Sequence, residues 1–134
     1  MKEIVIVGAL IRNYENKLFL MTSSKWKGYG LPGGKPQLDE SEEETLRREV
    51  KEEIGIELTD LVKAEEIILP PTDRIDGATT FIVKPYYALA LSMEIKPNKE
   101  VGEYRWYTIE EALRLPLLGP IRKTVEAYSR IFSN

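Results

Sequence analysis

Three glutamates near the middle of the chain have a spacing that could do chemistry. Glu49, Glu52 and Glu53 stand at i, i+3 and i+4, so on a helix their carboxylates would share one face. Like charges at this spacing repel unless cations neutralise them, and hard divalent ions such as Mg²⁺ or Mn²⁺ prefer carboxylate oxygens. Taken alone, the cluster indicates either a divalent-metal site or an ordinary solvated acidic face.

The composition restricts the rest of the chemistry to oxygen and nitrogen groups other than imidazole. The chain has no cysteine and no histidine, which excludes thiolate zinc ligands, a cysteine nucleophile, histidine bases and serine–histidine triads. Its formal charge of −3 provides no basic field for duplex DNA. Carboxylates, Lys, Tyr and metal-bound water remain for proton transfer.

A helix that begins near Ser41 and ends at Gly55 is expected to carry the three glutamates. Ser41 and Glu44 form a capping box, in which the serine accepts from first-turn amides and Glu44 reaches back. Gly55 suits a left-handed C-terminal cap. An apolar stripe at i, i+4 and i+8 would pack this helix on a sheet, and it comprises Leu46, Val50 and Ile54.

Strands and loops are expected on both sides of this helix. Apolar and β-branched runs predict strands at residues 4–11, 17–21, 61–69, 79–92 and 105–107. The first two flank turn-forming residues and indicate a hairpin. Residues 23–35 contain four glycines and a proline, which predicts a loop with unusual backbone angles, and residues 70–77 form a second loop.

The C-terminal part of the chain is expected to be helical. Thr108 and Glu111 form a second capping box, and Pro120 suits the first residue of a helix through about Phe132. Together the elements favour an α/β or α+β sandwich with a mixed sheet between helices. The 134 residues, of which 43% are apolar, fit one domain over residues 1–134.

The apolar run near the N-terminus does not suggest a membrane protein. It ends at Arg12 after about eight residues, which is too short for a span, and no small-residue cleavage site follows. We therefore expect a cytoplasmic protein with no membrane partner and no duplex DNA partner. Whether the chain forms a homodimer is left open.

The glutamates fall within a longer pattern. Residues 34–56 follow the spacing Gly-x5-Glu-x7-Arg-Glu-(apolar)-x-Glu-Glu-x-Gly-(apolar) and resemble the Nudix box without a mismatch; the named positions are Gly34, Glu40, Arg48, Glu49, Glu52, Glu53 and Gly55. Such a match by chance has a probability of about 10⁻⁸ per starting position. The resemblance extends to the Gly30–Gly34 loop and more loosely to the rest of the chain.

The resemblance implies a Nudix fold, an alpha-beta-alpha sandwich with a central mixed sheet, and the hydrolysis of a nucleoside diphosphate linked to another moiety. By position, Glu52 and Glu53 resemble the principal ligands of Mg²⁺ or Mn²⁺. Glu49 resembles a further ligand or the base that activates water, and the carbonyl of Gly33 resembles a backbone ligand. Arg48 resembles the residue that orients the carboxylates.

The remaining box positions are expected to be structural, and one later loop is expected to supply a further catalytic carboxylate. Glu40, Gly34 and Gly55 resemble structural positions of the box. Many Nudix enzymes take an extra ligand or base from a glutamate in the loop before a tryptophan, and the chain offers Glu100 and Glu103 before Trp106. We favour Glu100 over Glu103, with surface exposure as the alternative for each.

Candidate substrate contacts lie in the glycine loop and beyond the box. Lys25, Lys27 and Lys35 could attract phosphates, and aromatic residues could stack on a base; the latter are Trp26, Tyr29 and Tyr86. Solvation and core packing are the alternatives. We expect Lys35, Trp26 and Tyr29 to contact substrate, and Trp106 to lie in the core.

Pro71 bears on the substrate. It lies fifteen positions after Ile56, and Nudix ADP-ribose pyrophosphatases are similar in this respect. The chain has no tyrosine at a comparable distance, which counts against a dinucleoside polyphosphate as substrate. Residues 115–120 contain no asparagine of the kind that some oxidised-guanine hydrolases use to bind the base. ADP-ribose or a nucleotide sugar is thus expected first and a noncanonical or oxidised nucleoside triphosphate second. A noncatalytic nucleotide- or RNA-binding module is the rival class, but the box has lost no carboxylate.

Overall fold

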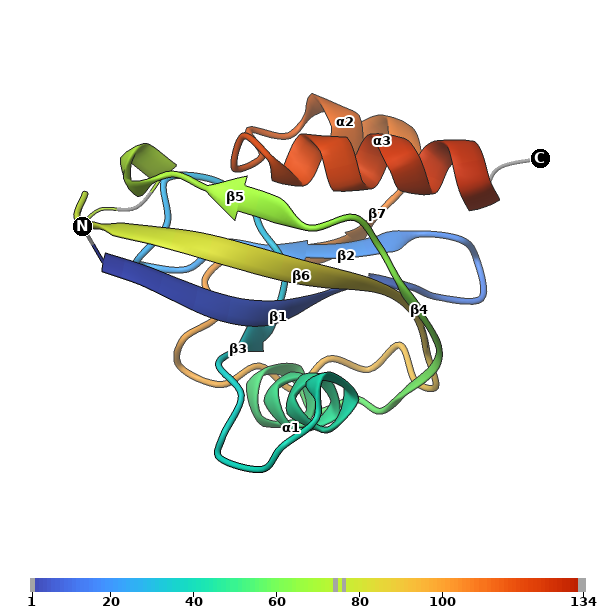
Figure 1. The fold of residues 1–134 in the computed structure, drawn as a ribbon. Helices are drawn as coiled ribbons and strands as arrows, with labels where there is room; N and C mark the ends of the chain where they lie inside the picture. Colours follow the sequence, from blue (N-terminus) through green and yellow to red (C-terminus); the bar gives the residue numbers. More distant parts are fainter. Residues whose placement is uncertain (1, 74, 76, 133–134) are drawn as a thin grey trace.

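The computed structural model describes residues 2–73, 75 and 77–132, and a mixed sheet forms its centre (Figure 1). The strands are β1 Lys2–Arg12, β2 Leu18–Met21, β3 Gly33–Gly34, β4 Leu58–Lys63, β5 Ile67–Leu69, β6 Thr79–Ala90 and β7 Tyr104–Tyr107. Their order in the sheet is β4-β6-β1-β2-β7, while β3 pairs with β1 and β5 with β6. β1 runs parallel to β6 and antiparallel to β2. The expected mixed sheet and N-terminal hairpin are confirmed.

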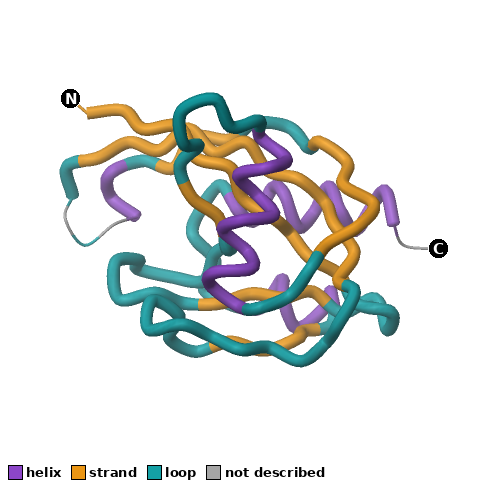
Figure 2. Tube along the Cα trace, turned by 90° about the horizontal axis from the view of Figure 1, so that it is seen from below, coloured by secondary structure: helices purple, strands orange, loops and turns teal. Residues whose placement is uncertain are grey.

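Helices cover both faces of the sheet. Helix α1, Glu42–Ile54, lies on one face, and helices α2, Ile109–Arg114, and α3, Ile121–Phe132, lie on the other (Figure 1). A view turned by 90° shows α1 crossing in front of the strands (Figure 2). The expected sandwich is confirmed. No helix in the described part of the chain is long and apolar enough to cross a membrane.

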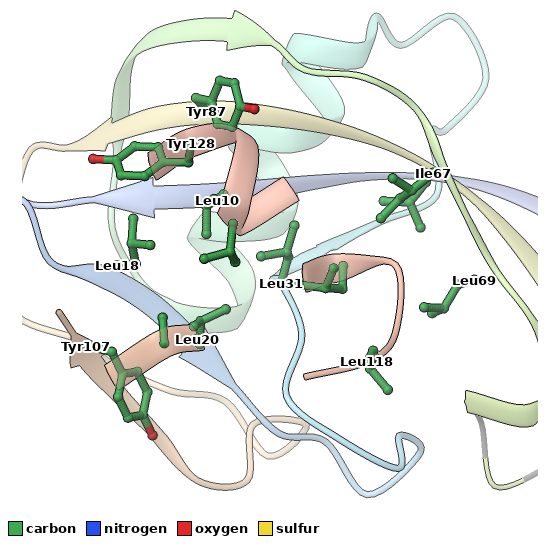
Figure 3. Packing of buried hydrophobic residues seen from close by; sticks show 14 of the residues in the cluster. Leu10, Leu18, Leu20, Leu31, Ile67, Leu69, Tyr87, Tyr107, Leu118 and Tyr128 are labelled. Atoms are coloured by element: carbon green, nitrogen blue, oxygen red, sulfur yellow. The ribbon is translucent and has the colours of Figure 1, made fainter. Parts of the chain in front are cut away.

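Each face of the sheet has its own apolar core. On the α1 face, the predicted stripe of Leu46, Val50 and Ile54 is fully buried against residues such as Val7 and Ile11. On the opposite face, leucines of β1 and β2 pack with aromatic side chains such as Tyr87, Tyr107 and Tyr128 (Figure 3). Burial of the stripe fixes which way α1 faces the sheet, because apolar area removed from water contributes roughly 25 cal/mol per Å².

The predicted ends of α1 are confirmed. The Ser41 hydroxyl accepts from the Glu44 amide at 3.1 Å, and the Glu44 carboxylate accepts from the Ser41 amide at 2.8 Å. At the other end Gly55 adopts φ 75° and its amide donates to the Lys51 carbonyl, so the left-handed cap satisfies an otherwise orphan acceptor. These caps place the box glutamates on a helix of defined length.

Two expectations differ from the structure. The segment expected as one strand at residues 61–69 forms β4 and β5, which both pair with the long β6 and are separated by residues 64–66. Within β4 itself, a register shift between Thr59 and Val62, with Asp60 at φ 53°, also interrupts the regular pairing with β6. The second difference concerns the glycines of residues 23–35, which do not have the left-handed backbone angles that the sequence suggested. Among the described glycines, Gly55 and Gly77 have a positive φ.

Candidate active site

A cleft of 410 Å³ brings the box together with residues that are distant in sequence. Its wall includes Glu49 and Glu53 of α1, Gly33 and Gly34 of β3, and Glu100 of the loop that precedes β7. Three sequence segments thus contribute to one concave surface. The cleft contains most of the residues expected to act on substrate.

Glu53 is the most buried carboxylate of the cleft. Its residue is 6% exposed, and the amide of Gly33 donates to its Oε1 at 2.8 Å. Burial first, and then the charges of Glu49, Glu100 and Glu52, together raise the pKa of Glu53 to about 8, against the opposing hydrogen bond from the Gly33 amide. A carboxylate so placed favours a cation nearby, because a cation would compensate its burial.

Glu49 and Glu52 lie closer to solvent than Glu53. The Glu49 side chain is 19% exposed and the Glu52 side chain 57% exposed. Burial, opposed by the Arg48 guanidinium, raises the pKa of Glu49 above its ordinary value. The three carboxylates therefore differ in burial along the expected face, from the buried Glu53 through Glu49 to the exposed Glu52. The reason is that consecutive helical positions such as 52 and 53 are rotated by about 100° around the helix axis.

Arg48 connects the start of the box to its glutamates. Its Nε and Nη2 donate to the two carboxylate oxygens of Glu40 at 2.7 and 2.9 Å, and its Nη1 donates to Glu49 Oε1 at 2.9 Å. The same Nη1 lies 3.5 Å from Glu52 Oε2. The fork of the guanidinium allows this geometry, because one planar group presents five donors.

Glu40 is held as an ionised acceptor. Hydrogen bonds from Arg48, then the amide of Gln37 and the hydroxyl of Thr45, lower the pKa of Glu40 to about 2. The Gln37 amide and Thr45 hydroxyl donate to Oε1 at 2.9 and 2.8 Å. Glu40 thus fastens the loop before α1 to the helix, as expected for a structural position.

Two glycines are needed because other atoms approach their backbone closely. A Cβ on Gly33 would lie 2.0 Å from the carbonyl oxygen of Val7, and one on Gly34 would lie 2.4 Å from Glu49 Cδ. Both contacts are far below ordinary van der Waals distance. Close approach of other atoms, rather than the unusual backbone angles expected for this loop, is therefore the reason for glycine at these two positions.

Glu100 and Glu103 lie in different surroundings. Glu100 lines the cleft with Glu49 and Glu53. The Glu103 carboxylate instead accepts from the Tyr29 hydroxyl at 3.1 Å, and Glu103 is absent from the described residues that line the cleft. The geometry therefore favours Glu100 as the loop carboxylate nearest the box.

The predicted substrate contacts are only partly gathered in the cleft. Lys25, Trp26 and Lys35 line it. Tyr29 is absent from its described lining, and its ring packs edge-on against Tyr107 at 6.0 Å between centroids. Tyr86, at 8% exposure, packs under α1. Its buried ring has no free face for a base.

Pro71 lies outside the described lining of the cleft. It begins the 3₁₀ turn η1, Pro71–Asp73, in the expected loop of residues 70–77, of which 74 and 76 lie outside the described residues. Two backbone hydrogen bonds tie this loop to the glycine loop, from the Lys27 amide to the Asp73 carbonyl and from the Ile75 amide to the Lys25 carbonyl. Pro71 could therefore act on the cleft only through the adjoining loop.

Sequence reasoning missed the apolar wall of the cleft. Ile4 and Ile6 of β1 and Phe81 of β6 line it, since the parallel register pairs Ile4 with Phe81. In the sequence these residues look like ordinary apolar residues of a buried strand. Their place depends on the pairing of distant strands, which no local signal encodes.

The donor set fits a hard divalent cation. The candidate ligands are the carboxylates of Glu49, Glu52 and Glu53 and the carbonyl of Gly33, all oxygen donors of the kind that Mg²⁺ and Mn²⁺ prefer. The burial of Glu53 beside three other carboxylates supports the fit. Within the described residues, however, no three His, Cys, Asp or Glu side chains are grouped so that they could hold a metal ion. In this arrangement Glu49 accepts from Arg48, and Glu53 accepts from the Gly33 amide.

Known proteins resemble the chain in fold and sequence. A model of the NUDIX domain matches residues 2–128, and the chain belongs to the Nudix family. A MutT protein from Methanosarcina mazei is 27% identical, with a TM-score of 0.79 over 99% of this chain and 97% of that one. A MutT NUDIX hydrolase from Burkholderia pseudomallei is 26% identical, with a TM-score of 0.76 over 94% and 98%.

Two other known proteins are similar to the chain, one in fold and one in sequence. The NUDIX domain of Shewanella oneidensis NrtR, solved with ADP ribose, shares the fold at 21% identity, with a TM-score of 0.77 over 98% of this chain and 90% of that one. An mRNA decapping complex subunit 2 from Schizosaccharomyces pombe is 26% identical over 75% of this chain. The chain spans 16% of the length of that subunit.

Proposed function

We propose that the protein is a divalent-metal-dependent pyrophosphohydrolase that cleaves the diphosphate linkage of a nucleoside diphosphate derivative. The observation that carries this proposal is the convergence of Glu49, Glu53 and Glu100 on the Gly33–Gly34 backbone in one cleft. The complete box in a chain of the Nudix family supports it. A noncatalytic sensor would not need every box carboxylate.

The carboxylates and one carbonyl supply the chemistry of the site. Glu49, Glu52, Glu53 and the Gly33 carbonyl would hold Mg²⁺ or Mn²⁺. When bound, such an ion would screen the diphosphate charge and acidify the attacking water. Glu49 or Glu100 would accept the proton of that water, since the chain has no histidine. Arg48 would keep Glu49 in place through the 2.9 Å hydrogen bond from its Nη1.

ADP-ribose or a nucleotide sugar is the proposed substrate. Trp26 could stack on the base, and Lys35 could attract the phosphates, since both line the cleft beside the box. The apolar wall formed by Ile4, Ile6 and Phe81 would exclude water from the bound nucleotide. The spacing of Pro71 after the box and the ADP ribose complex of the NrtR domain support this choice.

A noncanonical nucleoside triphosphate is the second candidate. Its support is the similarity of the chain to MutT proteins, at 26% to 27% identity over nearly the whole length. The box recognises a diphosphate that both substrate classes share, so the box does not discriminate between them.

A panel of nucleotides tests the proposal. The protein would be incubated with excess Mg²⁺ or Mn²⁺ and with ADP-ribose, nucleotide sugars and triphosphates, and products would be separated by chromatography. We expect AMP and ribose 5-phosphate from ADP-ribose, and no products after chelation. Release of products at the same rate by Glu53→Gln would contradict the proposed site, and cleavage of no compound would contradict the proposed activity.

A further inference from the structure

The loop that carries Glu100 is fastened at both ends. At one end the Asn98 amide donates to the Glu53 carbonyl of α1 at 2.8 Å, and the Asn98 side chain accepts from the Glu100 amide at 2.9 Å. At the other end the Gly102 amide donates to the Thr22 carbonyl at 2.8 Å. This loop therefore takes its position from the catalytic helix on one side and from the chain after β2 on the other.

Glu103 holds the second end through its backbone and through its side chain. The Glu103 amide donates to Thr22 Oγ1 at 2.8 Å, and the Glu103 carbonyl accepts from the Thr22 amide at 2.8 Å. Its carboxylate accepts from the Tyr29 hydroxyl at 3.1 Å. The fit is tight, because a Cβ on Gly102 would lie 2.5 Å from Thr22 Oγ1.

Tyr29 is itself well anchored. Its amide donates to the Pro116 carbonyl at 2.9 Å, and its carbonyl accepts from the Leu118 amide at 2.9 Å. Its ring meets the Tyr107 ring edge-on, at 87° between planes. The neighbouring Tyr107 side chain, followed by burial and Glu103, raises the pKa of Tyr29 above its ordinary value, so the hydroxyl keeps its proton and remains a donor.

We propose that Tyr29 and Glu103 are positioning residues, a clamp that holds the Glu100 carboxylate against the box and links it to the segment of residues 116–118. The proposal rests on the proposed function, because it concerns the placement of a catalytic carboxylate. Fastening matters for a loop residue, since a misplacement of about 1 Å can cost roughly 100-fold in rate. Tyr29 then acts through Glu103 rather than on a base.

The contacts of the clamp distinguish it from the two obvious alternatives. If Glu103 were a metal ligand or base, its negative charge would be essential. In the structure the Glu103 carboxylate serves as an acceptor for Tyr29 and lies outside the described cleft lining. If Tyr29 were a stacking platform, its ring would matter and its hydroxyl would not.

Four variants test the clamp. Tyr29→Phe removes the donor but keeps the ring, Glu103→Ala removes the acceptor, and Glu103→Gln keeps an acceptor oxygen without the charge. Tyr14→Phe, which removes an exposed hydroxyl in the β1–β2 turn, is the matched control. The readouts are kcat and KM for the best substrate, and hydrogen exchange of the amides of residues 98–103.

We expect kcat to fall about tenfold or more in Tyr29→Phe and Glu103→Ala, with KM within about twofold, because placement of a catalytic group affects the chemical step. Amide exchange of residues 98–103 should accelerate in the same two variants. Glu103→Gln should retain most of the wild-type kcat, and Tyr14→Phe should match the wild type in every readout.

Two results would overturn the clamp. One is a Glu103→Gln variant as impaired as Glu103→Ala, which would show that the charge of Glu103 is what matters. The other is unchanged amide exchange of residues 98–103 in Tyr29→Phe and Glu103→Ala. If the wild-type protein cleaved no nucleotide, the proposed function would fail while hydrogen exchange would still decide whether the clamp exists.

Discussion

Glu53 and Glu52 are sequence neighbours with opposite surroundings. Glu53 is 6% exposed and bound to the Gly33 amide, whereas the Glu52 side chain is 57% exposed. The motif identifies both residues because spacing is visible in a sequence. Burial is not visible there, since it depends on Gly33 of β3 lying over the last turn of α1.

Neutral replacements should separate catalysis from stability at these two positions. Glu52→Gln and Glu53→Gln should each lower turnover by at least about tenfold, or about 1.4 kcal/mol in barrier height. The melting temperature should stay the same or rise, because Glu52→Gln removes a like charge, while Glu53→Gln keeps an acceptor for Gly33 and replaces a carboxyl whose ionisation burial already disfavours. Activity and melting would be measured together with Glu57→Gln as an exposed control; normal turnover in both variants would argue against the ligand assignment.

Glu40 should make stability depend on acid pH. Its pKa is lowered from 4.5 to about 2, first by the hydrogen bond from Arg48. Because the pKa of Glu40 is lower in the folded state than in the unfolded state, its ionised form stabilises the fold at any pH above the unfolded-state pKa of about 4.5. This contribution disappears as the pH falls from about 4.5 toward about 2. Urea midpoints of wild type and Glu40→Gln should therefore differ at neutral pH and converge in this range. An unchanged difference throughout would refute the pairing; Glu126→Gln on α3 is the control.

Helix α1 shows which elements a sequence can predict. Its ends follow from local chemistry, the Ser41 capping box and the left-handed Gly55, and both are confirmed. The short strand β3 and the division between β4 and β5 were not foreseen. Their existence depends on pairing with β1 and β6 across the sheet, and a two-residue strand has no periodicity to read.

The contact between β3 and α1 can be tested by adding one methyl group. In Gly34→Ala the new Cβ would meet the flexible Glu49 carboxylate at 2.4 Å, so the side chain should move, with a large loss of activity and little loss of stability. In Gly33→Ala the new Cβ would lie 2.0 Å from the carbonyl oxygen of Val7. Because backbone atoms cannot move aside easily, this change should destabilise the fold by about 1–3 kcal/mol or more.

Gly119→Ala is the matched control for these glycine variants, since its nearest atom would be Asp73 Oδ2 at 3.7 Å. Activity and urea unfolding of the three variants would be compared with the wild type. Full activity in Gly34→Ala would show that Glu49 tolerates displacement and would weaken its proposed role.

At the scale of the whole molecule, some residues that line the cleft could be predicted from the sequence and others could not. The box residues Glu49 and Glu53 could be predicted from their pattern, while Ile4 and Phe81 could not, because they meet through the parallel register of β1 and β6. Tyr29 was expected to contact substrate. The structure instead packs it against Tyr107, which shows that an aromatic type alone does not predict its partner.

Divalent cations should stabilise the whole fold. Because the candidate ligands come from both α1 and β3, an ion bound there would bind the folded chain and not the unfolded one. Mg²⁺ at about 100 times its dissociation constant would then add about 2.7 kcal/mol. Melting scans with and without Mg²⁺ or Mn²⁺ measure this shift, and chelation should stop hydrolysis. Unchanged melting together with chelator-resistant hydrolysis would mean that the chemistry is different.

We expect the choice of substrate to depend on the loops around the cleft rather than on the box. Hydrogen bonds from the Lys27 amide to the Asp73 carbonyl and from the Ile75 amide to the Lys25 carbonyl join the loop that follows Pro71 to the residues on either side of Trp26. We therefore expect ADP-ribose to be hydrolysed with higher kcat/KM than 8-oxo-dGTP. Substrate discrimination of this kind arises from loop contacts, because the diphosphate is common to both compounds.

Competition between the two compounds at matched Mg²⁺ gives the ratio of their kcat/KM values directly. Trp26→Leu should reduce kcat/KM for both, since stacking is tolerant of base identity, while Pro71→Ala should reduce it mainly for ADP-ribose. A preference for 8-oxo-dGTP by about tenfold, or about 1.4 kcal/mol, would reverse the proposed order of substrates. Equal losses for both compounds in Pro71→Ala would remove Pro71 as a determinant of substrate choice.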